Sequence, residues 1–177
     1  VRVIVWGVGA MGKGIAEMRL NKQGVDVVGA VVRGDKIGKS MYDFLDMERG
    51  NREDLITGSY QDVIKEGAAD IVVIATDSFT RDSFDKMRYC LERKINVIST
   101  AEEMSYPQAQ EPELAKELDR IAKANGATVL GTGINPGLIM DLLVIILTGA
   151  CIDVESIKAQ RINNLSLNLK SLWLGKE

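Results

Sequence analysis

Short apolar runs rich in Val and Ile recur along the chain, and longer amphipathic segments separate them. The runs that predict strands cover residues 1–6, 25–32, 70–75, 96–99 and 127–130. Runs that are apolar at almost every position are typical of parallel strands that are covered on both faces. We therefore expect a buried parallel sheet.

The segments between these runs carry apolar residues at helical spacing. One helix is expected after the first run, with Met11, Ile15 and Met18 on one side. Ser78 or Thr80 is expected to cap the helix between the third and fourth runs. The spaced apolar positions of that helix and of the next are Phe84, Met87, Cys90, Leu91, Leu114, Leu118, Ile121 and Ala122. Strands and helices thus alternate.

This alternation predicts an α/β fold with a doubly wound parallel sheet and right-handed crossovers. Asn125 and Gly126 form a stop signal for the helix before the fifth run. The connection over residues 33–69 is long, and it has only weak helical patterns at residues 41–47 and 60–66.

After the fifth run, Asn135-Pro136-Gly137 is expected to open one more helix, because proline is tolerated in a first turn. The apolar stretch at residues 138–147 is shorter than the roughly 18 residues that span a bilayer. It predicts a buried helix, in which Asp141 would need a polar partner.

Two further segments follow. Residues 154–162 predict another strand, and LSLNLKSLWL at residues 165–174 alternates apolar and polar positions without an obvious partner. We expect one domain at residues 1–135, followed by a linking helix and the start of an incomplete second domain at residues 136–177.

The sequence GVGAMG satisfies the pattern G-x-G-x-x-G between a predicted strand and a predicted helix, which is the context of a dinucleotide-binding turn. Gly7 would permit the tight turn, Gly9 the approach of a pyrophosphate, and Gly12 close packing of helix on strand. Ala10 and Met11 would lie at the same helix N-terminus, whose N–H groups favour an anion. The pattern indicates a Rossmann-type sheet. The alternative is a glycine-rich turn without a ligand.

The second run ends in VVRGDK, where an NAD site normally has an acidic residue that binds the ribose. Here the first polar side chain is Arg33, with Lys36 and Lys39 nearby. A planar cation and ammonium groups suit a 2′-phosphate, so NADP is favoured over NAD. Two alternatives remain open: Asp35 could bind the ribose of NAD, and the lysines could belong to a solvated loop.

The third run is followed by Thr76, Asp77 and Ser78, at the sheet edge where open α/β sheets bind ligands. These small polar residues could line the nicotinamide ribose of the cofactor. Alternatively, they only cap the helix that follows.

Two adjacent carboxylates, Glu102 and Glu103, follow the fourth run in STAEEMSYP. They could bind a cationic substrate, and one could act as a base if burial raises its pKa. The alternative is a pair of surface glutamates at a helix start. After the fifth run, Asn135 again lies beside a helix N-terminus that could hold a substrate carboxylate or the nicotinamide carboxamide.

Charge and composition narrow the choice of ligand. With 22 basic and 25 acidic residues, the net charge of −3 gives no reason to expect nucleic acid or a membrane as partner, so we expect a small molecule. Cys90 and Cys151 lack CxxC spacing, which argues against a zinc site and a disulfide framework and favours a cytoplasmic location. The chain has no histidine. Any proton chemistry must therefore use carboxylates, lysines, tyrosines or water.

Four strings, WGVGAMGKG, IATDSFT, INVISTAEEMSYP and GTGINPGLIMDLL, resemble the 2,4-diaminopentanoate dehydrogenase family, which is related to dihydrodipicolinate reductase. The resemblance covers residues 1–162. It implies NAD(P)-dependent oxidative deamination of 2,4-diaminopentanoate to 2-amino-4-oxopentanoate and ammonia. It also implies that Glu102 and Glu103 receive the dicationic substrate and that Asn135 orients the substrate or the nicotinamide.

Members of this family continue into an α+β substrate-binding and oligomerisation domain, of which this chain would hold only the start. A homo-oligomer, dimer or tetramer, is therefore expected. The nearest rival is an imine reductase of the dihydrodipicolinate type, which usually has a histidine pair that this chain lacks. A module that senses NADP without catalysis is the rival from another class.

Overall fold

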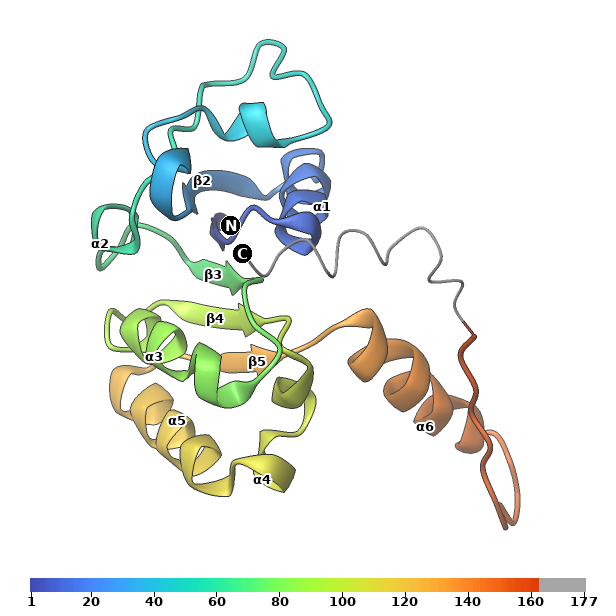
Figure 1. The fold of residues 1–177 in the computed structure, drawn as a ribbon. Helices are drawn as coiled ribbons and strands as arrows, with labels where there is room; N and C mark the ends of the chain where they lie inside the picture. Colours follow the sequence, from blue (N-terminus) through green and yellow to red (C-terminus); the bar gives the residue numbers. More distant parts are fainter. Residues whose placement is uncertain (163–177) are drawn as a thin grey trace.

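The protein's structure is a computed structural model, which describes residues 1–162. Five strands form one parallel sheet in the order β2-β1-β3-β4-β5 (Figure 1). The strands are β1 (Arg2–Trp6), β2 (Asp26–Val31), β3 (Ile71–Ile74), β4 (Asn96–Ser99) and β5 (Val129–Gly131). Each lies on its predicted apolar run, so the predicted α/β fold with a parallel sheet is confirmed.

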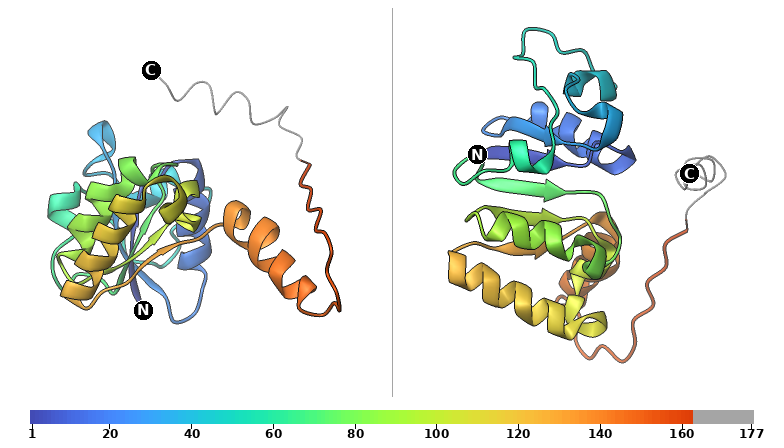
Figure 2. Two further views of the ribbon diagram at one scale, coloured as in Figure 1. Left: turned by 90° about the horizontal axis from the view of Figure 1, so that it is seen from below. Right: turned by 60° about the vertical axis from the view of Figure 1, so that its left-hand side comes forward.

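Helices cover both faces of this sheet (Figure 2). On one face pack α1 (Ala10–Leu20) and the turn η2 (Met41–Phe44). On the other pack α2 (Tyr60–Val63), α3 (Thr80–Leu91) and α5 (Pro112–Asn125). The remaining elements are η1 (Gly34–Lys36), η3 (Glu102–Ser105), α4 (Pro107–Gln110), η4 (Ile134–Leu142) and α6 (Leu143–Thr148).

Strand β1 is buried on both faces. Ile4 and Trp6 belong to the core under α3 and α5, whereas Val5 belongs to the core under α1. This division follows from the alternation of side chains along a strand. The loop that leaves Trp6 is therefore anchored in a fixed strand at the carboxyl edge of the sheet.

The buried side of α1 differs from the prediction. Met11 and Met18 are 67% and 59% exposed, while Gly12 and Ala16 face the sheet. A Cβ on Gly12 would lie 1.6 Å from the carbonyl oxygen of Gly7, so only glycine fits at this position without a shift of the backbone. The apolar spacing of larger side chains thus pointed to the wrong side of the helix.

The ends of α3 and α5 were predicted with different success. The N-cap of α3 is Phe79, which offers no side-chain hydrogen bond, and the buried hydroxyl of Thr80 has no partner among the described residues. The predicted cap at Ser78 or Thr80 is therefore wrong. The stop at α5 is confirmed, because Gly126 adopts a left-handed φ of 63°.

The chain after β5 also departs from expectation. Asn135, Pro136 and Gly137 are non-helical, and the helix that continues into α6 begins only after them. Gly137 has a φ of 127°, which a helix cannot contain, so the proline precedes the helix. Asp141 is exposed and accepts a hydrogen bond from the Gly137 N–H at 2.7 Å.

The helix predicted to be buried at residues 138–147 is exposed instead. Leu142, Ile145 and Leu147 are exposed, because η4 and α6 lead away from the sheet and no part of residues 1–162 covers this apolar side (Figure 1). The strand predicted at residues 154–162 is absent, since no other described segment pairs with it. The alternating segment at residues 165–174 lies outside the described residues.

Within residues 1–162, no helix combines the length and the apolar character needed to cross a membrane.

Candidate functional site

The glycine loop connects β1 to α1 at the carboxyl edge of the sheet. Gly7 has a φ of 99°, and its N–H donates to the carbonyl of Val31 at 2.9 Å. A Cβ on Gly7 would lie 2.5 Å from the Thr76 methyl group, whereas one on Gly9 would meet nothing within 4 Å. The loop is thus packed against protein at Gly7 and Gly12 and open at Gly9, as a phosphate cradle requires.

The N-terminus of α1 is free to bind an anion. Its N-cap is Gly9, which has no side chain to fill the first-turn N–H groups, and the first turn contains no acidic residue. Ala10 and Met11 are both exposed there. Unfilled N–H groups and the positive end of the helix dipole favour a pyrophosphate at this position.

A cavity of about 170 Å³ opens beside this loop. A second cavity, of about 480 Å³, lies between β1, β2, α2 and α3. Both are lined by Trp6, Val31, Val32 and Arg33. The two cavities therefore adjoin, and together they offer room for the adenosine half of a dinucleotide.

Aromatic residues line the larger cavity. Trp6 and Tyr60 stack with ring centroids 5.4 Å apart, and Tyr89 meets Tyr60 edge-on at 4.8 Å. Sequence reasoning missed these rings as ligand-site candidates. Trp6 directly before the glycine motif was the one available signal, since Tyr60 and Tyr89 come from distant parts of the chain.

The three cationic residues that follow β2 have different surroundings. Arg33 lines both cavities, and Lys36 lines the smaller one, with its ammonium 5.2 Å from the ring centroid of Phe44. Asp35 is 91% exposed and faces Lys39 at 4.0 Å, outside both cavities. Of the charged residues in this loop, Arg33 and Lys36 therefore border the smaller cavity, and Asp35 does not.

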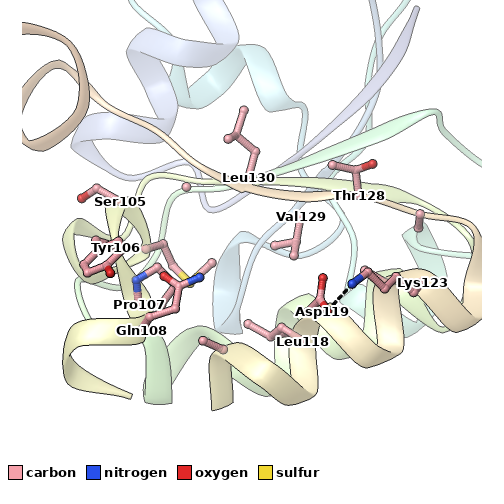
Figure 3. Close-up of a pocket in the computed structure, with 15 residues that line it drawn as sticks. Ser105, Tyr106, Pro107, Gln108, Leu118, Asp119, Lys123, Thr128, Val129 and Leu130 are labelled. Carbon is pink, nitrogen blue, oxygen red and sulfur yellow. Dashed lines mark hydrogen bonds and ion pairs between the residues drawn. The ribbon is translucent and has the colours of Figure 1, made fainter. Parts of the chain in front are cut away.

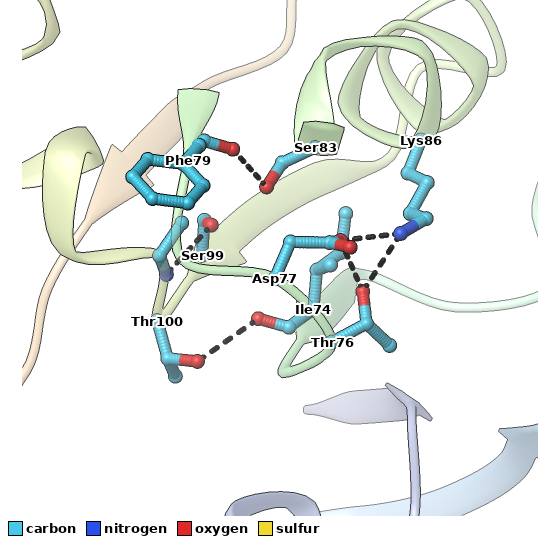
Figure 4. A network of polar contacts seen from close by, with 9 residues as sticks. Ile74, Thr76, Asp77, Phe79, Ser83, Lys86, Ser99 and Thr100 are labelled. Carbon is cyan, nitrogen blue, oxygen red and sulfur yellow. Dashed lines mark hydrogen bonds and ion pairs between the residues drawn. The ribbon is translucent and has the colours of Figure 1, made fainter. Parts of the chain in front are cut away.

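Thr76 and Asp77 form a polar network with Lys86 of α3 (Figure 4). The Lys86 ammonium donates to the Thr76 hydroxyl at 3.0 Å and pairs closely with the Asp77 carboxylate. The Thr76 hydroxyl in turn donates to Asp77 at 2.5 Å. Sequence reasoning missed Lys86, because no local pattern links it to a loop nine residues earlier. Of the predicted Thr76, Asp77 and Ser78, Thr76 lines the smaller cavity, and the other two line neither of the two adjoining cavities.

The end of β4 is tied to the end of β3. The Thr100 N–H donates to the carbonyl of Ile74 at 3.0 Å, and the Thr100 hydroxyl donates to the same carbonyl at 3.4 Å (Figure 4). The Ala101 N–H donates to the Ser99 hydroxyl at 3.2 Å. These bonds bring the turn η3, with both predicted carboxylates, to the same sheet edge as the glycine loop.

Within η3 the two glutamates have different surroundings. Glu103 is partly buried, and its carboxylate accepts from the Thr80 N–H at 2.9 Å. Glu102 is exposed, and its side chain has no hydrogen bond or ion pair within residues 1–162. Sequence alone could not separate these neighbours.

Asn135 is exposed in η4, the element that follows β5 and contacts η3. Its side chain likewise has no hydrogen-bond partner among residues 1–162. The structure thus brings the segments of Glu102 and Asn135 together at one edge of the sheet, beyond the glycine loop.

A further cavity, of about 560 Å³, lies elsewhere, between α5, η3 and the edge strand β5 (Figure 3). Its wall includes Tyr106, Leu118, Lys123 and Leu130, but none of the predicted cofactor or catalytic residues. We therefore exclude it from the candidate site. Residues 1–162 contain no cluster of His, Cys, Asp and Glu that could hold a metal ion.

A parallel sheet, a glycine cradle and an open helix N-terminus at its carboxyl edge define a dinucleotide-binding domain of the Rossmann type. Residues 1–132 match the family model described as dihydrodipicolinate reductase, N-terminus, and residues 138–172 match the 2,4-diaminopentanoate dehydrogenase C-terminal domain. The chain belongs to the family of dihydrodipicolinate reductase N-terminal domains. This family implies that the chain binds NAD(P).

Three similar proteins support this assignment. The 2,4-diaminopentanoate dehydrogenase of Acetoanaerobium sticklandii is 63% identical over 94% of this chain and 47% of its own length. An amine dehydrogenase structure from Mycobacterium smegmatis has 35% identity and a TM-score of 0.75, over 87% of this chain and 45% of that one. A mutant meso-dapdh of Clostridium tetani E88 has 19% identity and a TM-score of 0.62, over 84% and 41%; it supports the fold alone. The chain spans about half the length of these relatives.

Proposed function

We propose that the polypeptide containing this chain catalyses the NAD(P)-dependent oxidative deamination of 2,4-diaminopentanoate to 2-amino-4-oxopentanoate and ammonia. The observation that carries this proposal is the 63% identity to a 2,4-diaminopentanoate dehydrogenase. That identity extends over 94% of the chain, and so over the segment of the paired carboxylates.

The nucleotide is held by this chain's own backbone and cations. The N–H groups at the start of α1 bind the pyrophosphate, with Gly9 leaving the space for its approach. The guanidinium of Arg33 and the ammonium of Lys36 bind the 2′-phosphate, so NADP is preferred over NAD. The larger cavity, which Trp6 lines, receives the adenine ring. When bound, the nicotinamide accepts the hydride.

The substrate is held at the opposite end of the site. Glu102 binds the ammonium group at C4 and takes the proton that the amine must lose before a hydride can leave that carbon. Its exposed carboxylate, without a protein partner in residues 1–162, supports this role. Asn135 orients the substrate. Water then adds to the imine carbon, and ammonia leaves to give the ketone.

Assembly and location remain parts of the same proposal. The exposed apolar residues of η4 and α6, among them Leu142, Ile145 and Leu147, support burial against further protein. This agrees with the predicted homo-oligomer, dimer or tetramer. The proposed amino acid catabolism is consistent with a cytoplasmic location.

The test is nucleotide reduction, followed by absorbance, with the polypeptide that the whole gene encodes. We expect NADP to be reduced with 2,4-diaminopentanoate and not with ornithine or alanine. Binding of the nucleotide without turnover of any of these amines would overturn the dehydrogenase proposal. The outcome would then favour imine reduction or nucleotide sensing.

A further inference from the structure

Two hydrogen bonds join η3 to the loop that leads into α3. The Glu103 carboxylate accepts from the Thr80 N–H at 2.9 Å, and the Glu103 N–H donates to the carbonyl of Ser78 at 3.2 Å. Glu103 therefore contacts the β3–α3 connection at Ser78 and also Thr80, the first residue of α3. This connection includes Thr76, which lines the nucleotide cavity.

The Glu103 carboxylate supplies a hydrogen-bond acceptor at the N-terminus of α3. The first N–H groups of a helix need an acceptor, and an acidic side chain there also interacts favourably with the helix dipole. Phe79 occupies the N-cap position without offering an acceptor. Glu103, from a turn 23 residues further along the chain, supplies the acceptor instead.

The opposite side of η3 is held by β5. A Cβ on Gly131 would lie only 1.8 Å from the carbonyl oxygen of Met104, so the two backbones are in direct contact. Met104 itself is buried. Close to this contact, the Thr132 N–H donates to the carbonyl of Ser99 at 3.0 Å. The turn is thus fixed between α3 and β5, and Glu103 is its side-chain link to α3.

We propose that Glu103 is a positioning residue, which fixes the η3 backbone and thereby places the neighbouring Glu102 carboxylate over the substrate. This inference rests on the proposed function of Glu102. It assigns adjacent, chemically identical side chains to different tasks. Glu103 acts through the N-terminus of α3, and Glu102 contacts the substrate.

The first test does not need a substrate. Amide hydrogen exchange is compared between the wild type and E103A, E103Q and E102A, over peptides that contain residues 76–84 and 100–106. Loss of the acceptor in E103A should raise exchange about tenfold in both segments, which corresponds to about 1.4 kcal/mol and lies within the range for a lost helix cap. E103Q keeps an acceptor oxygen and should exchange nearly as the wild type does. E102A is the matched control and should change neither segment.

The second test uses turnover by the polypeptide that the whole gene encodes. E103A should lower kcat about tenfold, because a displaced carboxylate reacts poorly. E103Q should stay within about threefold of the wild type and keep its kcat–pH profile. E102Q should lose at least about a hundredfold in kcat together with the acidic limb of that profile.

Two results would overturn the assignment of Glu103. In one, E103A leaves exchange unchanged in both segments. In the other, E103Q loses as much kcat as E102Q and loses the acidic limb as well, which would make Glu103 the reacting group. If the wild type turns over no diamine, the proposed function fails, and the exchange result alone decides whether Glu103 fixes η3.

Discussion

The proposed preference for NADP depends on Arg33, because Arg33 borders both cavities whereas Asp35 lines neither. Replacing Arg33 by alanine should weaken NADP binding about tenfold to a hundredfold, the range for a lost hydrogen bond to a charged group. NAD binding should change little. Isothermal titration calorimetry of R33A with each nucleotide measures both effects.

The matched control for this variant is K39A. Lys39 faces Asp35 and lines neither cavity, so its removal should leave the affinity for both nucleotides unchanged. Equal losses of NADP and NAD affinity in R33A would contradict the assignment of Arg33 to a 2′-phosphate.

The two cysteines offer a second test at the scale of single residues. Cys90 is fully buried, and burial raises the pKa of its thiol to about 12, whereas Cys151 is exposed. Because only the thiolate reacts, iodoacetamide at pH 8 should label Cys151 and leave Cys90 unmodified. Labelling of Cys90 should appear only after unfolding in denaturant. Peptide mass spectrometry distinguishes the sites, and equal labelling of both in the native chain would show that the α3 core is open.

At the scale of elements, α1 contains two glycines with opposite surroundings. A Cβ on Gly12 would lie 1.6 Å from the Gly7 carbonyl oxygen, whereas one on Gly14 would meet nothing within 4 Å. G12A should therefore lower the free energy of unfolding by about 1–3 kcal/mol, as overpacking does. G14A should raise it by up to about 1 kcal/mol, because alanine is the better helix former.

Chemical denaturation of the 177-residue chain measures both variants under the same conditions. G12A should also weaken nucleotide binding, since the glycine loop must shift. Similar unfolding free energies for the two variants would mean that α1 does not pack against Gly7 as described.

The start of β3 is held to β1 by an ion pair that depends on pH. Asp70 accepts from the Arg2 N–H at 2.7 Å and from its guanidinium at 3.1 Å, and these hydrogen bonds lower the pKa of the Asp70 carboxyl. A lowered pKa in the folded state means that the pair stabilises the protein above about pH 4 and loses this effect as the pH falls further. The difference in Tm between wild type and D70N should therefore be largest near neutral pH and shrink below about pH 4. A difference that stays constant down to pH 2 would contradict this account.

The strands could be predicted from the sequence, but not all of the contacts between elements. Continuous apolar runs identify β1 and β3 because these strands are buried on both faces, whereas β5, at the edge of the sheet, leaves Leu130 54% exposed. The cap of α3 could not be found, because its acceptor, Glu103, is distant in sequence. The buried side of α1 was missed because Gly12 and Ala16 contribute little to an apolar pattern.

The residues of the candidate site were likewise only partly predictable from the sequence. The glycine pattern and Arg33 are local signals, and both border the smaller cavity. Tyr60 and Lys86 gained their relevance only from the packing of α2 and α3 onto β1. The strand expected at residues 154–162 does not form, because a segment with a strand-like pattern becomes a strand only where a neighbouring strand can hydrogen-bond to its backbone.

For the whole molecule, the parallel topology explains why distant residues converge. The glycine loop, Arg33, Thr76, Glu102 and Asn135 all follow the carboxyl ends of strands, so they share one edge of the sheet. The proposed nucleotide end of this edge is built from residues 6–36 and Thr76. The proposed substrate end borders η4 and α6, whose apolar side is exposed within residues 1–162.

The central claim is that hydride and ammonia both leave the same carbon of 2,4-diaminopentanoate. The most direct measurement is therefore the stoichiometry of a single reaction, in which NADPH, ammonia and 2-amino-4-oxopentanoate are quantified for the polypeptide that the whole gene encodes. We predict equal amounts of all three products, and at least about a hundredfold less of each from E102Q over the same time. NADPH formed without ammonia, or no NADPH while the nucleotide is bound, would contradict the account.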